Sequence, residues 1–191
     1  MKLKFAVAAS LAMFVHLAVA QDTAALLDDT RKTALPVLPK VVGTMQKAIK
    51  EGGVVGAIPV CKEKAPQMLQ ELRQKTGWSI SRVSLKTRNP ATGTPDVWEA
   101  RQLADFNIRV AAGARPDQLE ASEVVTGADG KRYFRYMKAL PVVEVCASCH
   151  GAKESFPEAL QSALAKDYPH DQATGYAIGQ IRGALTVKRP L

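Results

Sequence analysis

Cysteine and histidine are scarce in this chain of 191 residues, which contains three of each. Three cysteines are too few for the disulfide framework of a small secreted domain, and they cannot all pair with one another. A structural zinc site, which takes four Cys or His ligands, is poorly supported for the same reason. Aromatic residues make up only 6% of the chain and are not interleaved with its basic residues, so nucleic acid is not expected as a partner.

Long apolar runs are also absent, except at the N-terminus. There Lys2 and Lys4 precede an apolar stretch that ends in Ala18-Val19-Ala20, a pattern that predicts a secretory signal peptide over residues 1–20. A retained membrane anchor is the alternative, but the apolar stretch is short for a hydrocarbon core of roughly 30 Å. We therefore expect a periplasmic or secreted protein with no stable membrane insertion after cleavage.

Removing 20 residues from 191 leaves 171, which suits a single domain over residues 21–191. The net charge falls from +8 to +6, because the removed segment carries Lys2 and Lys4 and no acidic residue. The basic residues are scattered along the chain, and a surface of this kind attracts acidic partners.

Helical periodicity dominates the first part of the domain. Residues 22–51 carry apolar side chains near helical spacing, with a break expected around Pro36 and Pro39 and an end at Gly52-Gly53. A second helical pattern covers residues 57–75 and places Cys61 on its apolar stripe. Pro66 falls inside this pattern, so the regular helix is expected to begin near Ala65.

Strand patterns follow. We expect strands over residues 78–86, 123–126, 131–138 and 181–188, with a short helix over residues 96–107. The second and third strands flank Ala128-Asp129-Gly130, a hairpin turn in which Asp-Gly tolerates positive φ. Helices first and hairpin-connected strands later favour an α+β fold with an antiparallel sheet, an N-terminal helical arm and flanking helices.

One motif carries specific chemistry, namely Cys146-Ala147-Ser148-Cys149-His150. The C-x-x-C-H spacing is that of covalent haem attachment. Two thiols three positions apart can add to the two vinyl groups of one porphyrin, and the adjacent histidine is then held as a ligand of the iron. The motif therefore predicts one covalently attached haem c.

A redox-active dithiol is the main alternative interpretation of these cysteines. Such sites normally lie at the start of a helix beside a parallel sheet, and no βαβ pattern precedes Cys146. Haem attachment is therefore favoured, and a thiol–disulfide oxidoreductase site and a structural disulfide stay minor alternatives.

The sixth iron ligand is open on these grounds, since sulfur, imidazole or no residue can occupy that position. The candidates in the mature chain are Met45, Met68, Met137, His170 and Cys61. The methionines fall in apolar patterns where core packing is their usual role. Cys61 would be the one unpaired thiol of an exported protein, and binding to a metal would explain its presence.

Four separated segments resemble one known family. They are VCKEKAP around Cys61, LKTRNPATGTPDVWE at 85–99, CASCHG at 146–151, and YPHDQATGYAIGQIRGALTV at 168–187. Together they resemble the family of exported c-type haem domains with a PAS-like fold. Members of that family occur as stand-alone proteins and as input domains of membrane signalling proteins.

The resemblance implies that His150 and Cys61 are the two axial ligands. It also places Arg88 beside the haem, as a candidate partner for a propionate group. Trp98 is expected in the core, while Tyr176 and Arg182 are expected to brace the last strand.

Two functions follow as expectations. A soluble single-haem domain with a basic surface suits a single-electron carrier that docks an unidentified redox partner. The alternative is a redox or diatomic-gas sensor that signals through a partner protein. A peroxidase-like enzyme is disfavoured, because it needs an open iron face.

Overall fold

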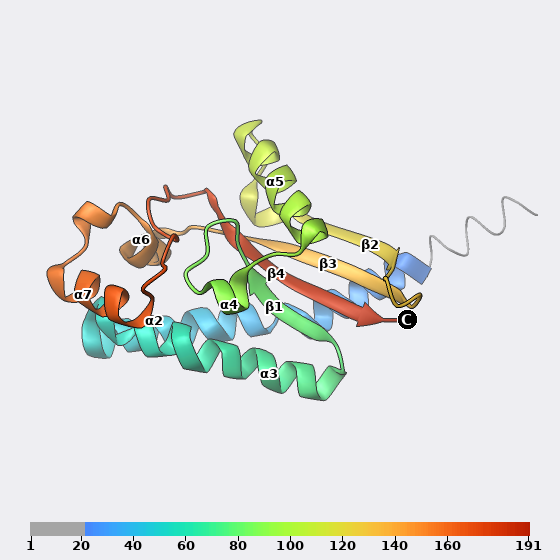
Figure 1. Ribbon diagram of the computed structural model, residues 1–191, viewed down its shortest axis with the longest axis horizontal. Coiled ribbons are helices and arrows are strands. Elements are labelled where there is room, and N and C mark those ends of the chain that lie inside the picture. The colour runs from blue at the N-terminus through green and yellow to red at the C-terminus, as the bar shows by residue number, and fades with distance from the viewer. Residues whose placement is uncertain (1–21) are drawn as a thin grey trace, which may run out of the picture.

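The computed structural model describes residues 22–191 (Figure 1). The predicted signal peptide over residues 1–20 lies outside the described residues, so its presence and cleavage stay predictions. None of the helices in residues 22–191 combines the length and the apolar character that a membrane crossing requires.

The helices precede the sheet and flank it. They are residues 22–34, α2 (Val37–Gly56), the π-helical turn η1 (Val60–Lys64), α3 (Ala65–Thr76), α4 (Pro90–Gly93), α5 (Val97–Ala111), α6 (Glu144–His150) and α7 (Glu158–Asp167), with short 3₁₀ turns at η2 (Pro116–Gln118) and η3 (Lys153–Ser155). Helix α5 begins at a capping box between Asp96 and Glu99, which satisfies backbone N–H groups at its first turn.

Four strands form one antiparallel sheet in the order β1-β4-β3-β2. They are β1 (Ser79–Val83), β2 (Glu120–Thr126), β3 (Arg132–Pro141) and β4 (Ile181–Pro190). Figure 1 shows α2 and α3 along one face of the sheet and α5 on the other, with α6 and α7 beyond the end that is remote from the C-terminus. The predicted α+β fold with an antiparallel sheet and flanking helices is confirmed.

Proline and glycine shape the N-terminal helical arm as the sequence predicted. Residues 35–36 form a turn between the helix at 22–34 and α2, at the position of Pro36. Gly52 and Gly53 depart from helical geometry, and Gly53 has φ of 63°, a value that glycine adopts without steric cost. The helix resumes after them, so the predicted end at Gly52-Gly53 is a kink within α2.

The two faces of the sheet carry separate cores, because successive side chains of a strand alternate between faces. The face toward α2 and α3 buries Ile80, Phe134, Tyr136, Leu185 and Val187. The face toward α5 buries Val83, Met137, Ala139 and Ala184 with Leu103 and Phe106 of that helix. A third cluster joins Ile58 to α7 through Phe156, Leu160, Leu164 and Tyr168.

A buried ion pair fastens α5 to the sheet. Arg135 Nη2 donates to Glu99 Oε1 at 3.0 Å, and the same oxygen accepts from Thr186 Oγ1 at 2.8 Å. The Arg135 guanidinium also lies 4.5 Å from the Trp98 ring centroid. The side chains of Arg135 and Glu99 are only 8% and 11% exposed. Arg135 Nη1 also donates to Asp96 Oδ2 at 2.7 Å, whereas the buried carboxylate of Glu99 depends on Arg135 for charge compensation.

Several boundaries differ from the sequence predictions. Strand β2 begins at Glu120, β3 ends at Pro141 and β4 ends at Pro190, so these strands are longer than their apolar alternation indicated. Strand β1 is shorter than predicted, because Ser84 leaves the ladder and its side chain accepts from the Lys86 N–H.

Replacing Arg135 with methionine is expected to lower the free energy of unfolding by about 3–5 kcal/mol, because Glu99 would keep a buried charge without a partner. Urea unfolding of the mature chain measures this change. Arg132→Met is the matched control, since Arg132 lies on the same strand and is exposed, and we expect a change within about 0.5 kcal/mol there. Equal losses in both variants would contradict the assignment.

Candidate functional site

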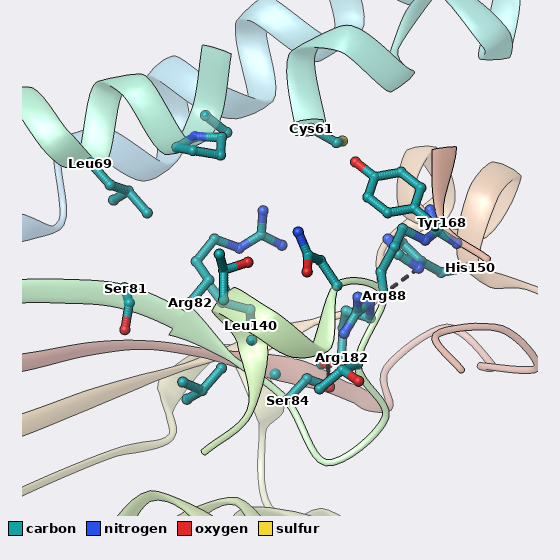
Figure 2. A pocket seen from close by; sticks show the side chains of 18 of the residues that line it. Cys61, Leu69, Ser81, Arg82, Ser84, Arg88, Leu140, His150, Tyr168 and Arg182 are labelled. Carbon is teal, nitrogen blue, oxygen red and sulfur yellow. Dashed lines mark hydrogen bonds between the residues drawn. The ribbon is translucent and has the colours of Figure 1, made fainter. Parts of the chain in front are cut away.

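Two adjoining cavities lie where α2, η1 and α3 meet α6 and the end of the sheet beside α6. One has a volume of about 260 Å³ and the other about 210 Å³. They share a wall, and the residues that line both are Cys61, Ala65, Leu69, Arg82, Arg88, Leu140, His150, Tyr168 and Arg182. Figure 2 shows Cys61 and Leu69 on the helical side of this space and Arg82 and Ser81 on the side of the sheet.

The larger cavity is mainly apolar. Helix α2 contributes one wall through Val37, Leu38, Val41, Val42 and Met45. The opposite wall includes Cys146 and Cys149 of α6. The smaller cavity is the more polar of the two, although its lining is still mostly apolar, and it extends along β1 toward α4, with Ser81, Ser84, Thr87, Asn89 and Thr92 in its lining. The combined space is therefore most apolar at the two thiols and more polar at β1.

The C-x-x-C-H motif forms α6, a helix of seven residues. Residues three apart lie on the same side of a helix, so Cys146 and Cys149 both reach the apolar cavity. Both are free thiols. Burial is the main cause that raises the pKa of Cys149. A Cβ at Gly151 would lie 2.6 Å from the Ala147 carbonyl oxygen, so only glycine permits this helix end.

The tautomer of His150 follows from its partner. Its Nδ1 lies 2.7 Å from the carbonyl oxygen of Ala173, and a carbonyl only accepts, so Nδ1 carries the proton. Arg182 Nε is 3.1 Å from the same nitrogen, but both groups are donors once Nδ1 is protonated, so this longer contact is not a hydrogen bond in that tautomer. The unprotonated nitrogen is therefore Nε2, the atom that a metal ion would bind.

His150 is neutral at physiological pH. Its pKa is lowered to about 2, first by burial and then by the positive charges of Arg182 and Arg88. The segment before β4 holds the histidine in place, because the Gly175 N–H donates to Gly151 O at 2.7 Å and the Tyr176 N–H donates to His150 O at 2.9 Å. Tyr176 thus braces His150 through its backbone N–H, and Arg182 lies against the same imidazole.

Cys61 lies in the π-helical turn η1, between α2 and α3. The Ala65 N–H bonds to the carbonyl of Val60, five residues earlier. Pro66 follows directly and has no N–H, so a regular α-helical ladder could not pass through this turn unbroken. The turn directs Cys61 into the wall shared by both cavities. Figure 2 shows its sulfur next to the Tyr168 ring, with His150 beyond that ring.

Of the other candidate iron ligands, three lie away from the cavities and one lines the larger of them. Met137 is buried on the α5 face of the sheet, and Met68 packs against the core under α2 and α3. His170 is exposed, and it is not among the described residues that line either cavity. Met45 lines the apolar cavity. The structure therefore brings Cys61 and Met45 to the same space as His150.

Arginine is the only charged residue type in the lining, where no Asp or Glu is found among the described residues. The arginines are Arg73, Arg82, Arg88 and Arg182. Arg88, predicted from the sequence to contact a propionate, donates to Asp171 Oδ2 at 3.0 Å and to Cys149 O at 2.5 Å. Arg88 thus lines the cavity while it ties α6 to the segment before β4, and its contact with a propionate stays a prediction.

Sequence reasoning missed Arg82. It lies on β1 two positions after the buried Ile80, so strand alternation places both on the face toward α3. A charged residue at such a position is the signal that could have identified it. Tyr168, which lines both cavities, was missed as well. Its pKa is raised to about 12, first by burial and then by Cys61.

Trp98 lies at the edge of the α5 core and is half-buried. Its Nε1 donates to Glu123 Oε2 at 2.6 Å. Trp98 therefore packs against the core as expected, but it is not fully buried there.

Comparison with known proteins identifies relatives in sequence and in fold. The sequence model of the family described as Tll0287-like matches residues 8–190. No curated protein matches the chain.

A solved structure described as the crystal structure of the cyanobacterial heme-protein Tll0287 superposes with a TM-score of 0.57 at 21% sequence identity. The match covers 82% of this chain and 94% of that one. At this identity the likeness shows the fold, and it agrees with the expected PAS-like α+β architecture. Because the family match spans nearly the whole sequence, the chain belongs to the Tll0287-like family.

Proposed function

We propose that this protein binds one haem c in the paired cavities and carries single electrons. One observation carries the proposal: α6 presents both thiols of its C-x-x-C-H motif to an apolar cavity whose shared wall contains His150 and Cys61. The solved relative in fold is described as a heme-protein, and this description supports the same cofactor here.

The residues present fit the chemistry of a haem. A porphyrin has an apolar body and two carboxylate side chains, and the combined space has an apolar end and an arginine-lined end. Typical ligand pockets measure roughly 300–1,000 Å³. Each cavity alone is smaller than that. The two cavities adjoin, so one ligand that extends through both would occupy their combined volume.

Four side chains would hold the group. Cys146 and Cys149 would each form a thioether, with the S–H adding across a vinyl C=C so that no atom leaves. His150 would bind iron through Nε2, because Nδ1 is held by Ala173. Cys61, in the wall shared by both cavities, would be the second protein ligand of the iron. The haem itself would supply reversible one-electron chemistry at the iron.

The surroundings of His150 suit a ligand with a constant protonation state. Burial and two nearby guanidinium groups lower its pKa to about 2, so the imidazole stays neutral and available to a metal. A hydrogen bond from the second ring nitrogen to a backbone carbonyl is the usual way in which proteins orient a ligating histidine.

An electron carrier of this type would dock a partner of opposite charge. The predicted mature chain has a net charge of +6 once the +8 of the full sequence loses Lys2 and Lys4. We infer a periplasmic or secreted location and an acidic protein partner, since complementary charge speeds the encounter of redox proteins.

A second function, redox or gas sensing, is favoured by the turn that carries Cys61. Single π-helical turns are uncommon and concentrate at functional sites, and the kink at Gly53 precedes this one in the chain. Release of Cys61 would let the turn rearrange and signal to a partner. Carbon monoxide added to the reduced protein separates the two functions: rapid binding favours the sensor, and no binding favours the carrier.

Replacing both Cys146 and Cys149 with alanine is expected to abolish covalent haem. In the wild-type chain the Soret absorption should stay with the protein through acid–acetone extraction, and in the double variant it should be extracted. Each single variant should retain one thioether and a shifted α band. A wild-type chain that contains no haem but cycles between dithiol and disulfide would instead support the thiol–disulfide oxidoreductase.

Replacing Cys61 with serine is expected to raise the reduction potential, because a bound thiolate stabilises ferric iron through its negative charge. Cys61→Met should raise it as well, since it keeps sulfur and removes the charge. Spectroelectrochemistry of the loaded protein measures both. Met45→Leu is the control, because Met45 is the other sulfur in the cavity lining. A shift in the Met45 variant alone would make Met45 the ligand.

A further inference from the structure

The arginines that line the polar cavity differ in what their side chains contact. Arg73 Nη1 donates to Ile80 O at 3.0 Å, and Arg88 pairs with Asp171. Arg182 donates from Nη1 to Lys86 O at 3.2 Å and lies against His150. Arg82 stands apart, because its guanidinium has no hydrogen bond or ion pair with any residue in the described range 22–191.

The position of Arg82 leaves its charge facing the cavities. Its side chain lines both cavities, and Figure 2 shows it extending from β1 into the space between the sheet and α3. A guanidinium presents five N–H donors, and a partly buried cation is destabilised unless an anion compensates it. Arg88 and Arg182, which line the same walls, add like charge.

Nothing acidic in the described lining can supply the missing anion. A planar guanidinium binds a carboxylate through two parallel hydrogen bonds, which makes carboxylate the best-fitting partner. We infer that Arg82 binds a carboxylate group inside the cavity, supplied by a propionate of the haem; this inference rests on the proposed function.

The polarity of the space supports this source. Cys146 and Cys149 line only the larger cavity, while Arg82 lies in the wall that both cavities share. A haem carries its vinyl groups and its propionates on opposite edges of the porphyrin. Thioethers at α6 therefore direct the carboxylates away from α6, and β1 lies on that side. A free carboxylate from solution has the same chemistry and is the alternative source.

The test compares three variants of the loaded full chain: Arg82→Gln, Arg82→Lys and Arg101→Gln. Arg101 is the matched control, because it is exposed on α5, on the other face of the sheet. We expect Arg82→Gln to lower the reduction potential and to shift the propionate bands of the resonance Raman spectrum. Without the Arg82 cation, the negative charge of the carboxylate is no longer compensated and stabilises ferric iron. The reduction potential is therefore expected to fall. Arg82→Lys should keep most of the wild-type potential, and Arg101→Gln should match the wild type.

The source of the carboxylate is tested by adding sodium acetate to the wild type at constant ionic strength. A potential independent of acetate supports a haem propionate. A saturable dependence that Arg82→Gln lacks supports a free carboxylate at Arg82. Potential and Raman bands that are equal in Arg82→Gln and Arg101→Gln, with no effect of acetate, would overturn the inference.

Two further outcomes are informative. If Arg82→Gln fails to load haem, loading of Arg82→Lys supports the need for a cation, and failure of both overturns it. If the wild type shows no Soret absorption, the proposed function fails separately. Calorimetric binding of acetate to the wild type but not to Arg82→Gln would then still support a carboxylate site, and no binding would overturn it.

Discussion

The hydrogen bond from His150 Nδ1 to the carbonyl oxygen of Ala173 is the contact on which the candidate site depends. It joins α6 to the segment that leads into β4, and the N–H groups of Gly175 and Tyr176 strengthen the same junction. It also decides which imidazole nitrogen is unprotonated. These contacts fix the orientation of α6, a short helix at the end of the sheet. In this orientation both thiols of α6 face the apolar cavity.

Stability comes largely from parts of the molecule that the site does not use. The α5 face of the sheet has its own core and the buried pair between Arg135 and Glu99. The opposite face is packed by α2 and α3 along most of its length, and this packing gives way to the two cavities near α6. The elements that line the cavities are therefore held in place by the two cores of the sheet.

The sequence predicted the general fold and the main chemical motif, but not the contacts that orient them. Alternating strands, the break at Pro36 and the Asp-Gly hairpin are local patterns, and each was predicted near its observed place. Helix α6 was not predicted as a helix, because seven residues give too little periodicity. The carbonyl of Ala173 could not have been found, since every residue has one. Arg82 could have been found from its spacing to Ile80.

The contrast between Arg88 and Arg82 shows how the polar end of the site is organised. Asp171 neutralises Arg88 and orients it, so that its remaining N–H groups reach the carbonyl of Cys149 and hold the end of α6. Arg88 is thus committed to structure before any ligand arrives. Arg82 makes no such contact with any of the described residues, so its charge is available to a ligand. With thiols at one end and an available cation at the other, the space distinguishes the two edges of a flat molecule. An amphiphile with one apolar and one anionic edge satisfies both ends in a single orientation, and the reversed orientation would bury its carboxylates against α2 while Arg82 stayed uncompensated.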